Sequence, residues 1–462
     1  MRVALLLVCL VAPLAHAQSS PPIPTEWVPE ADTIAVEIPE ASWSLEMAVA
    51  ELDSVNVFNL PLIYGGAKLS VSVFGGRDTL RIAPEASGVY RVHLRGLAQE
   101  AAMDFAFWPP EDVHFSDAFR AEHGGTSRFL TPEVFEFLNV VFALTPSGRE
   151  TESWLILKQG DYYESVMEHF GSYADHPFVA AMEAVIQDDE YVMVRSNGLA
   201  FRFEGDRLVA DPIYRSLGRG HERIESLLPL AESFSEASGF RDFYAAHEAE
   251  YARQRQEMER LLPVNQMWGW LEAEFPERSQ GYLTVFSPLI NGTHNAIELR
   301  DGDYRESVIF LPGPPILDAF GDGDSVVGTG TPAWREVEMT RMAFTEYDHT
   351  YVNPAMGPLA AEISEAMIDV SAWNRATDYQ SPSETFAEYM TWGVFLLYVD
   401  AFYPADTAQE AREGTIELME DRRGFFRFGD FMDALTLLYD ARTEGETLND
   451  LLPAIVQWTA RQ

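Results

Sequence analysis

The sequence predicts an α+β protein in which a small β-sandwich-like domain precedes a larger, helix-rich domain. Short runs that alternate or stay apolar, several of them separated by glycine turns, fill residues 32–112 and are typical of strands. Helical periodicity then dominates residues 113–462, with only two further strand-like runs. The change of pattern at Trp108-Pro-Pro-Glu111 marks the boundary between the two domains.

The individual elements follow from these patterns. Strands are expected at 33–38, 69–74, 79–82, 89–94 and 103–108, and later at 283–288 and 306–311. Helices are expected at 132–145, 162–170, 177–186, 227–262 with a break near Ser238-Gly239, 268–275, 340–350, 358–368, 383–402, 407–420, 428–441 and 448–458.

Residues 1–17 have the features of a secretory signal peptide. Arg2 supplies the positive start, an apolar run follows, and Ala15-His16-Ala17 fits the small-x-small cleavage pattern. We expect cleavage before Gln18, a flexible lead-in over 18–31, and an exported protein in the periplasm or outside the cell. The only cysteine, Cys9, lies inside the signal, so disulfides, thiol catalysis and thiolate metal ligands are excluded from the mature chain.

The chain is strongly acidic, with 73 Asp and Glu against 32 Lys and Arg. Such a field repels nucleic acid and anionic lipid, so we expect neither as a partner and no stable membrane insertion. Only Lys68 and Lys158 are lysines. Two interpretations stay open for this bias: a halophilic protein that remains soluble in high salt, or a GC-rich genome that favours arginine.

The strongest functional signal lies in residues 344–354, Phe-Thr-Glu-Tyr-Asp-His-Thr-Tyr-Val-Asn-Pro. This is the zinc-protease pattern H-E-x-x-H with Thr345 in place of the first histidine. In the intact pattern two histidines bind the metal and the glutamate activates a bound water. Glu346 and His349 keep the base and the second ligand, but a neutral hydroxyl is a poor zinc ligand. Thr345 therefore decides between an active hydrolase, a rearranged metal site and a silent relative.

Over roughly residues 125–440 the chain resembles a bacterial family known as domain of unknown function 4932, whose members look like gluzincin-type metallopeptidases. The matching stretches are 132–145, 162–170, 175–177, 238–243 with Tyr251, 287–294, 351–354 and 384–392. The resemblance implies a thermolysin-like core, helix-rich with a small sheet, for the larger domain. A subset of relatives carries Thr-Glu-x-Asp-His as here, which indicates a subfamily trait. The β-domain lies outside the resemblance.

The resemblance also implies a third metal ligand, a glutamate on a later helix. Glu384 and Glu388 are four residues apart and face the same way, so spacing cannot separate them. We prefer Glu388, although Trp392-Gly393 stands where the family has an Arg-Ala pair. Glu384 remains the alternative, and a solvated acidic helix face is the competing interpretation for both.

Further residues are candidates for the same cleft. His294, after a predicted strand, is the best replacement for the missing ligand, with an ordinary loop histidine as the competing interpretation. Asp348 projects about 100° away from His349 and is expected to orient a histidine or to pair with an arginine. Tyr351 is placed at the cleft with Thr345. Asn353-Pro354 is expected to end the helix, and Asn291-Gly-Thr293 matches a glycosylation acceptor, which is weak evidence on its own.

Two hypotheses follow. In the first, the protein is a zinc-dependent peptidase that acts on a peptide or protein, with Glu346 as base, His349 and Glu388 as ligands, and a third ligand from His294 or another nonstandard donor. In the second, it is a catalytically silent relative whose cleft binds a peptide or another polymer. The sequence leaves zinc binding, substrate and oligomeric state open.

Overall fold

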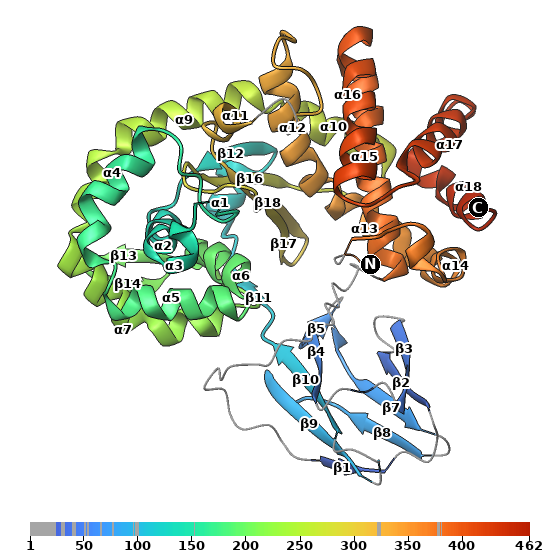
Figure 1. Ribbon diagram of the computed structural model, residues 1–462, viewed down its shortest axis with the longest axis horizontal. Helices are drawn as coiled ribbons and strands as arrows, with labels where there is room; N and C mark the ends of the chain where they lie inside the picture. Colours follow the sequence, from blue (N-terminus) through green and yellow to red (C-terminus); the bar gives the residue numbers. More distant parts are fainter. Residues whose placement is uncertain are drawn as a thin grey trace.

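The structure is a computed structural model that describes residues 25–462, except 29–32, 39–42, 50–51, 53–54, 65–66, 76–77, 96, 98–100, 152, 321–324, 377–378 and 380. The predicted signal peptide and its cleavage site lie outside the described residues. The chain is a mixture of helices and small sheets, and its carboxyl-terminal part is rich in helices (Figure 1). Among the helices of the described residues, none is long and apolar enough to cross a membrane.

The described amino-terminal part contains two four-stranded sheets, with the strand orders β1-β9-β10-β4 and β3-β2-β7-β8, and the two-stranded sheet β5-β6. Their inward side chains form one core, in which Phe58 and Phe105 stack at 4.9 Å between ring centroids. This part contains β1 (Thr25–Trp27), β2 (Thr33–Ile38), β3 (Trp43–Ala48), β4 (Val55–Pro61), β5 (Ile63–Tyr64), β6 (Ala67–Lys68), β7 (Val71–Gly75), β8 (Asp78–Ile82), β9 (Gly88–Leu94) and β10 (Ala101–Trp108).

Two predicted boundaries of the β-domain need correction. Residues 25–27, placed in the flexible lead-in, form β1, which pairs in parallel with β9. Residues 111–113 form β11 (Glu111–Val113), which pairs with β15 (Tyr214–Leu217) of the larger part rather than with the sandwich. Both segments are three residues long, too short for an alternating pattern to identify as strands.

A four-stranded sheet stands at the centre of the larger part, in the order β12-β16-β18-β17. Strands β12 (Thr126–Leu130), β16 (Gly281–Ser287) and β18 (Tyr304–Pro312) are parallel, and β17 (Asn295–Asp301) is the antiparallel edge. Alternate residues point to opposite faces of a strand. Accordingly Tyr282 and Phe286 of β16 belong to one hydrophobic core, whereas Leu283 and Val285 belong to another.

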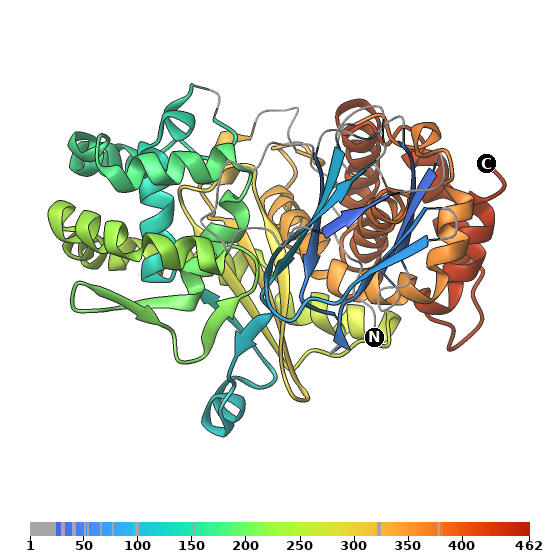
Figure 2. The same cartoon turned by 90° about the horizontal axis from the view of Figure 1, so that it is seen from below.

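Two groups of helices cover the sheet, one on either side (Figures 1 and 2). The first helix cluster contains α1 (Asp117–His123), α2 (Glu133–Leu144), α3 (Pro146–Arg149), α4 (Asp161–Phe170), α5 (Pro177–Gln187), α6 (Tyr191–Ser196), α7 (His221–Ser238), α8 (Phe240–Ala246) and α9 (Glu248–Leu261), together with the hairpin β13 (Phe201–Glu204) and β14 (Arg207–Ala210). The expected break near 238–239 is present, because Gly239 takes a left-handed φ of 66° between α7 and α8.

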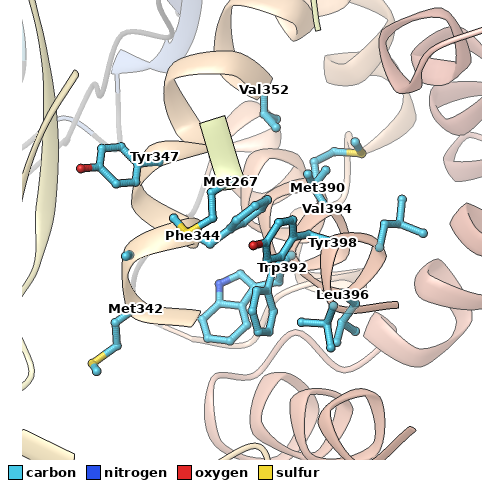
Figure 3. Packing of buried hydrophobic residues seen from close by; sticks show 14 of the residues in the cluster. Met267, Met342, Phe344, Tyr347, Val352, Met390, Trp392, Val394, Leu396 and Tyr398 are labelled. Carbon is cyan, nitrogen blue, oxygen red and sulfur yellow. The ribbon is translucent and has the colours of Figure 1, made fainter. Parts of the chain in front are cut away.

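The second helix cluster contains α10 (Val264–Glu274), α11 (Ile316–Ala319), α12 (Trp334–Tyr347), α13 (His349–Met356), α14 (Ala360–Ala366), α15 (Pro382–Phe402), α16 (Ala405–Glu417), α17 (Phe428–Asp440) and α18 (Leu448–Thr459). Helix α15 is its centre. Every residue from Thr385 to Val399 is buried, which is expected of a helix packed on all sides. Helices α12, α13, α14, α16 and α17 surround it. Figure 3 shows part of this core, where Phe344 of α12 packs on Tyr398 of α15 with 4.7 Å between ring centroids.

The motif segment is divided between two helices. Helix α12 ends at Tyr347 and α13 begins at His349, so the motif does not lie on one helix as predicted. The predicted helix end at Asn353-Pro354 is also wrong, since α13 continues to Met356. Proline has no N–H for the carbonyl four residues earlier. That carbonyl, of Thr350, instead accepts a hydrogen bond from Arg305 at 2.7 Å, which compensates the lost bond.

Candidate functional site

The motif residues meet two other segments of the chain at the junction of α12 and α13. His294 comes from the loop between β16 and β17, and Glu388 comes from the second turn of α15. The described contacts arrange these groups as two neighbouring histidine–glutamate pairs. One pair joins His294 to Glu346, and the other joins His349 to Glu388.

Thr345 is turned toward its own helix. Its side chain is buried, and its hydroxyl donates a hydrogen bond to the Arg341 carbonyl at 2.9 Å. Bonding to the carbonyl one turn back is a common use of a threonine hydroxyl inside a helix. The position of the first motif histidine is therefore occupied by a group whose only hydrogen is committed to the helix backbone.

Glu346 is paired with His294. The His294 Nδ1 lies 2.7 Å from Glu346 Oε1. Burial alone would raise the pKa of Glu346, but the neighbouring His294 and His349 outweigh it, so the pKa is lowered from its ordinary value. Glu346 is therefore an ionised carboxylate that only accepts, and Nδ1 must be the donor. Glu346, the candidate base, therefore accepts a hydrogen bond from His294.

His349 and Glu388 form the second pair, and Arg423 completes it. His349 Nε2 lies 3.6 Å from Glu388 Oε1, and Arg423 donates to Glu388 Oε2 at 2.8 Å. Burial would raise the pKa of Glu388, yet Arg423 and His349 lower it to about 2. Burial would lower the pKa of His349, yet Glu388 raises it to about 9. At neutral pH a carboxylate thus lies between an imidazolium and a guanidinium.

Arg423 is a site residue that the sequence analysis missed. It follows a π-helical turn at Leu418–Arg422 and precedes Gly424, whose φ is 82°. Such turns occur often at functional sites. Its guanidinium carbon lies 4.9 Å from the Trp392 ring centroid, which is a cation–π distance. The available signal was the arginine pair Arg422-Arg423 followed by Gly424, directly after a predicted helix.

Glu384 is not part of the pairs described above. It is the third residue of α15, where its Oε2 accepts from the Ser381 hydroxyl at 2.7 Å and from the Ser381 N–H at 3.2 Å. With the Ser381 hydroxyl accepting from the Glu384 N–H, this is a capping box. Sequence spacing alone could not decide whether Glu384 or Glu388 is the candidate ligand. The capping box occupies the Glu384 carboxylate and so distinguishes the two. The structure places only Glu388 beside His349.

Two further cleft candidates take no part in the histidine–glutamate pairs. Tyr351 is buried, and its hydroxyl bonds to that of Tyr282 on β16, so it faces the sheet. Asp348 is buried and, among the described residues, neither of its carboxyl oxygens has a hydrogen-bond partner. The expected role in orienting a histidine or pairing with an arginine is therefore wrong. Burial raises the pKa of Asp348 well above its ordinary value.

The donor set fits a zinc ion only in part. Two ligands at 2.0–2.2 Å in a tetrahedral site would be about 3.4 Å apart, close to the 3.6 Å between His349 and Glu388. A catalytic zinc needs three protein ligands. Thr345 is committed to its helix, and His294 is turned onto the candidate base. Within the described part of the chain, no group of three or more His, Cys, Asp or Glu is placed to hold a metal ion. The residues do not fit a complete zinc site.

Comparisons of the chain with protein-family models, with curated proteins and with solved structures give no match. The functional conclusion therefore depends on the sequence motif and the geometry described above.

Proposed function

We propose that this chain is an exported relative of the gluzincin-like metallopeptidases of the domain of unknown function 4932 family, in which internal ion pairs stand in place of zinc. It binds a peptide segment without hydrolysing it. The motif supports the relationship, and the amino-terminal sequence supports export. One observation carries the loss of metal chemistry: Arg423 donates to the carboxylate of Glu388, the preferred third ligand, at 2.8 Å.

The physical argument is one of charge. A buried carboxylate needs a compensating cation, which in a metalloenzyme is the metal. Here the side chain of Glu388 is 6% exposed, and its two oxygens face the Arg423 guanidinium and the His349 imidazole. The carboxylate is thus already neutralised. A dication that entered would have to displace a proton from His349 and lie close to a guanidinium, and both requirements weaken zinc binding.

Peptide binding is supported by the position of the sheet edge. Strand β17 begins at Asn295, next to His294, and forms the edge of the central sheet. The outer edge of a sheet can pair with an extended peptide through main-chain hydrogen bonds. Such a ligand would lie beside the two histidine–glutamate pairs, which offer charged partners for its polar groups.

Metal-dependent hydrolysis is the second candidate. It is favoured by the 3.6 Å between His349 Nε2 and Glu388 Oε1, a spacing that two zinc ligands could share. It also requires a third ligand, for which the sequence offers His294.

A chelator experiment separates the two functions. The exported protein is mixed with fluorescein-labelled casein, and both anisotropy and release of small fragments are measured with and without EDTA. We expect binding that EDTA leaves unchanged, and no fragment release. Fragment release that EDTA abolishes and that Glu346→Gln removes would overturn the proposal in favour of hydrolysis. Neither binding nor cleavage would also overturn it.

A further inference from the structure

Arg195 is a fully buried arginine without a carboxylate partner among the described residues. It lies on α6, and its side chain has no solvent exposure. Burial lowers the pKa of Arg195 to about 10. Its guanidinium donates to the Thr293 hydroxyl at 2.7 Å and to the Thr293 carbonyl at 3.3 Å. A buried cation that lacks a counter-ion is costly, so its retention calls for a reason.

The next residue on α6 holds the other side of the same loop. The Asn295 Nδ2 amide donates to Ser196 Oγ at 3.2 Å, while the single hydrogen of that hydroxyl can bond to the Val192 carbonyl at 2.9 Å or to Asn295 Oδ1 at 3.3 Å. Helix α6 is therefore hydrogen-bonded to Thr293 and Asn295, which are the two neighbours of His294. Between these two anchors, the His294 ring points at Glu346 on α12.

The loop before His294 is held in the same manner. Asn291 donates its side-chain amide to the Ser153 carbonyl at 2.8 Å, and Gly292 donates its N–H to the Trp154 carbonyl at 3.1 Å. The two polar residues that match a glycosylation acceptor thus serve as internal anchors, since the Thr293 hydroxyl accepts from Arg195. The segment that carries His294 is therefore hydrogen-bonded to α6 and to the loop between α3 and α4.

We infer that Arg195, assisted by Ser196, is the positioning residue that directs the His294 ring onto Glu346. The His294 side chain is 28% exposed, and an exposed ring without support would lose rotational freedom on pairing. Fixing Thr293 and Asn295 removes that cost in advance, as supporting hydrogen bonds do for functional groups in general. The buried guanidinium suits this role because it donates to a hydroxyl and a carbonyl of one residue at once.

The inference rests on the proposed function only in counting the His294–Glu346 pair as part of the binding site. Its test needs neither ligand nor metal. The protein is labelled with ¹⁵N-histidine, and the His294 Nδ1–H proton is assigned by its loss in His294→Asn. Its exchange with solvent is then compared between the wild type, Thr293→Val and Arg195→Gln.

We expect the Nδ1–H proton to exchange at least about ten-fold faster in both variants, because loss of one anchoring hydrogen bond raises the open fraction of the loop. Thr126→Val is the matched control: it removes a threonine hydroxyl bonded to the His123 carbonyl, away from the site. If Arg195→Gln fails to fold, the exchange rate of the His294 Nδ1–H proton in Thr293→Val still tests the inference. Unchanged exchange in a folded Thr293→Val would overturn the inference. That outcome would leave the chelator result on the proposed function untouched.

Discussion

Glu136 provides the most quantitative prediction. It lies on α2 in the first helix cluster and is fully buried. The Tyr162 hydroxyl donates to its Oε1 at 2.8 Å, and that hydroxyl lies 2.6 Å from the Tyr251 hydroxyl. Burial raises the pKa of Glu136 from 4.5 to about 7, although hydrogen bonds from the Ser287 and Tyr162 hydroxyls favour the carboxylate.

The sign and size of the effect follow by linkage. Between pH 4.5 and 7 the folded protein binds more protons at Glu136 than the unfolded chain does, so the free energy of unfolding falls as pH rises. The stabilisation is complete below pH 4.5 and is lost as pH rises through about 7. A difference of about 2.5 pKa units corresponds to about 3 kcal/mol in total, most of it lost between pH 5 and pH 8.

The perturbation is Glu136→Gln, which has a similar shape and no titration. Urea unfolding followed by tryptophan fluorescence is measured from pH 5 to pH 8 for both proteins, and the difference in unfolding free energy is plotted against pH. Glu136→Gln should gain about 2–3 kcal/mol relative to the wild type across this range. Glu259→Gln, which removes an exposed carboxyl on α9, is the matched control. A flat difference for Glu136→Gln would refute the reasoning.

Further predictions concern the site and its supports. Arg423→Gln should destabilise the fold by about 2–3 kcal/mol at pH 7, because the buried Glu388 carboxylate keeps only one cation. The loss is moderate for a buried pair because the Arg423 side chain is a quarter exposed. This cost should shrink below pH 4.5, because the pKa of Glu388 is held at about 2 only while Arg423 is present. Urea unfolding at pH 3 and pH 7 measures this, and an equal cost at both would contradict it. Ser381→Ala should cost about 1 kcal/mol through loss of the α15 cap, whereas Glu384→Gln, which can still form the capping box, should cost less and leave the His349–Glu388 pair intact. Thermal melting compares the two, and a larger loss from Glu384→Gln would refute its assignment to the cap.

Much of the fold was predictable because hydrophobic periodicity is local. The strands at 33–38 and 103–108 and the helices at 132–145 and 428–441 follow directly from their patterns, with ends that agree within a few residues. Pairing between distant segments was not predictable. The parallel pairing of β4 with β10, and the association of 111–113 with the larger part, depend on tertiary packing that no short window of sequence contains.

The sequence predicted which residues form the site better than it predicted how they pair. The motif and the spacing of two glutamates pointed to His349 and Glu388, and the structure brings these within 3.6 Å. Glu384 could have been excluded as a ligand only by knowing that α15 begins after Ser381 and with Pro382, which makes Glu384 part of the helix cap. Arg423 was missed because it comes from a segment 35 residues beyond Glu388, and the arginine pair at 422–423 does not by itself indicate which carboxylate it contacts.

The central claim is that the chain's own cations occupy the place of the metal. It is tested most directly by the zinc content per chain, after dialysis against zinc and then buffer, of the wild type, Thr345→His, and Thr345→His combined with Arg423→Met. Thr443→His, which adds an exposed histidine elsewhere, is the matched control. The account predicts almost no zinc in the wild type and the control, and about one zinc per chain in the double variant, where two histidines and Glu388 supply three ligands. About one zinc per chain in the wild type, lost in His294→Ala, would contradict it.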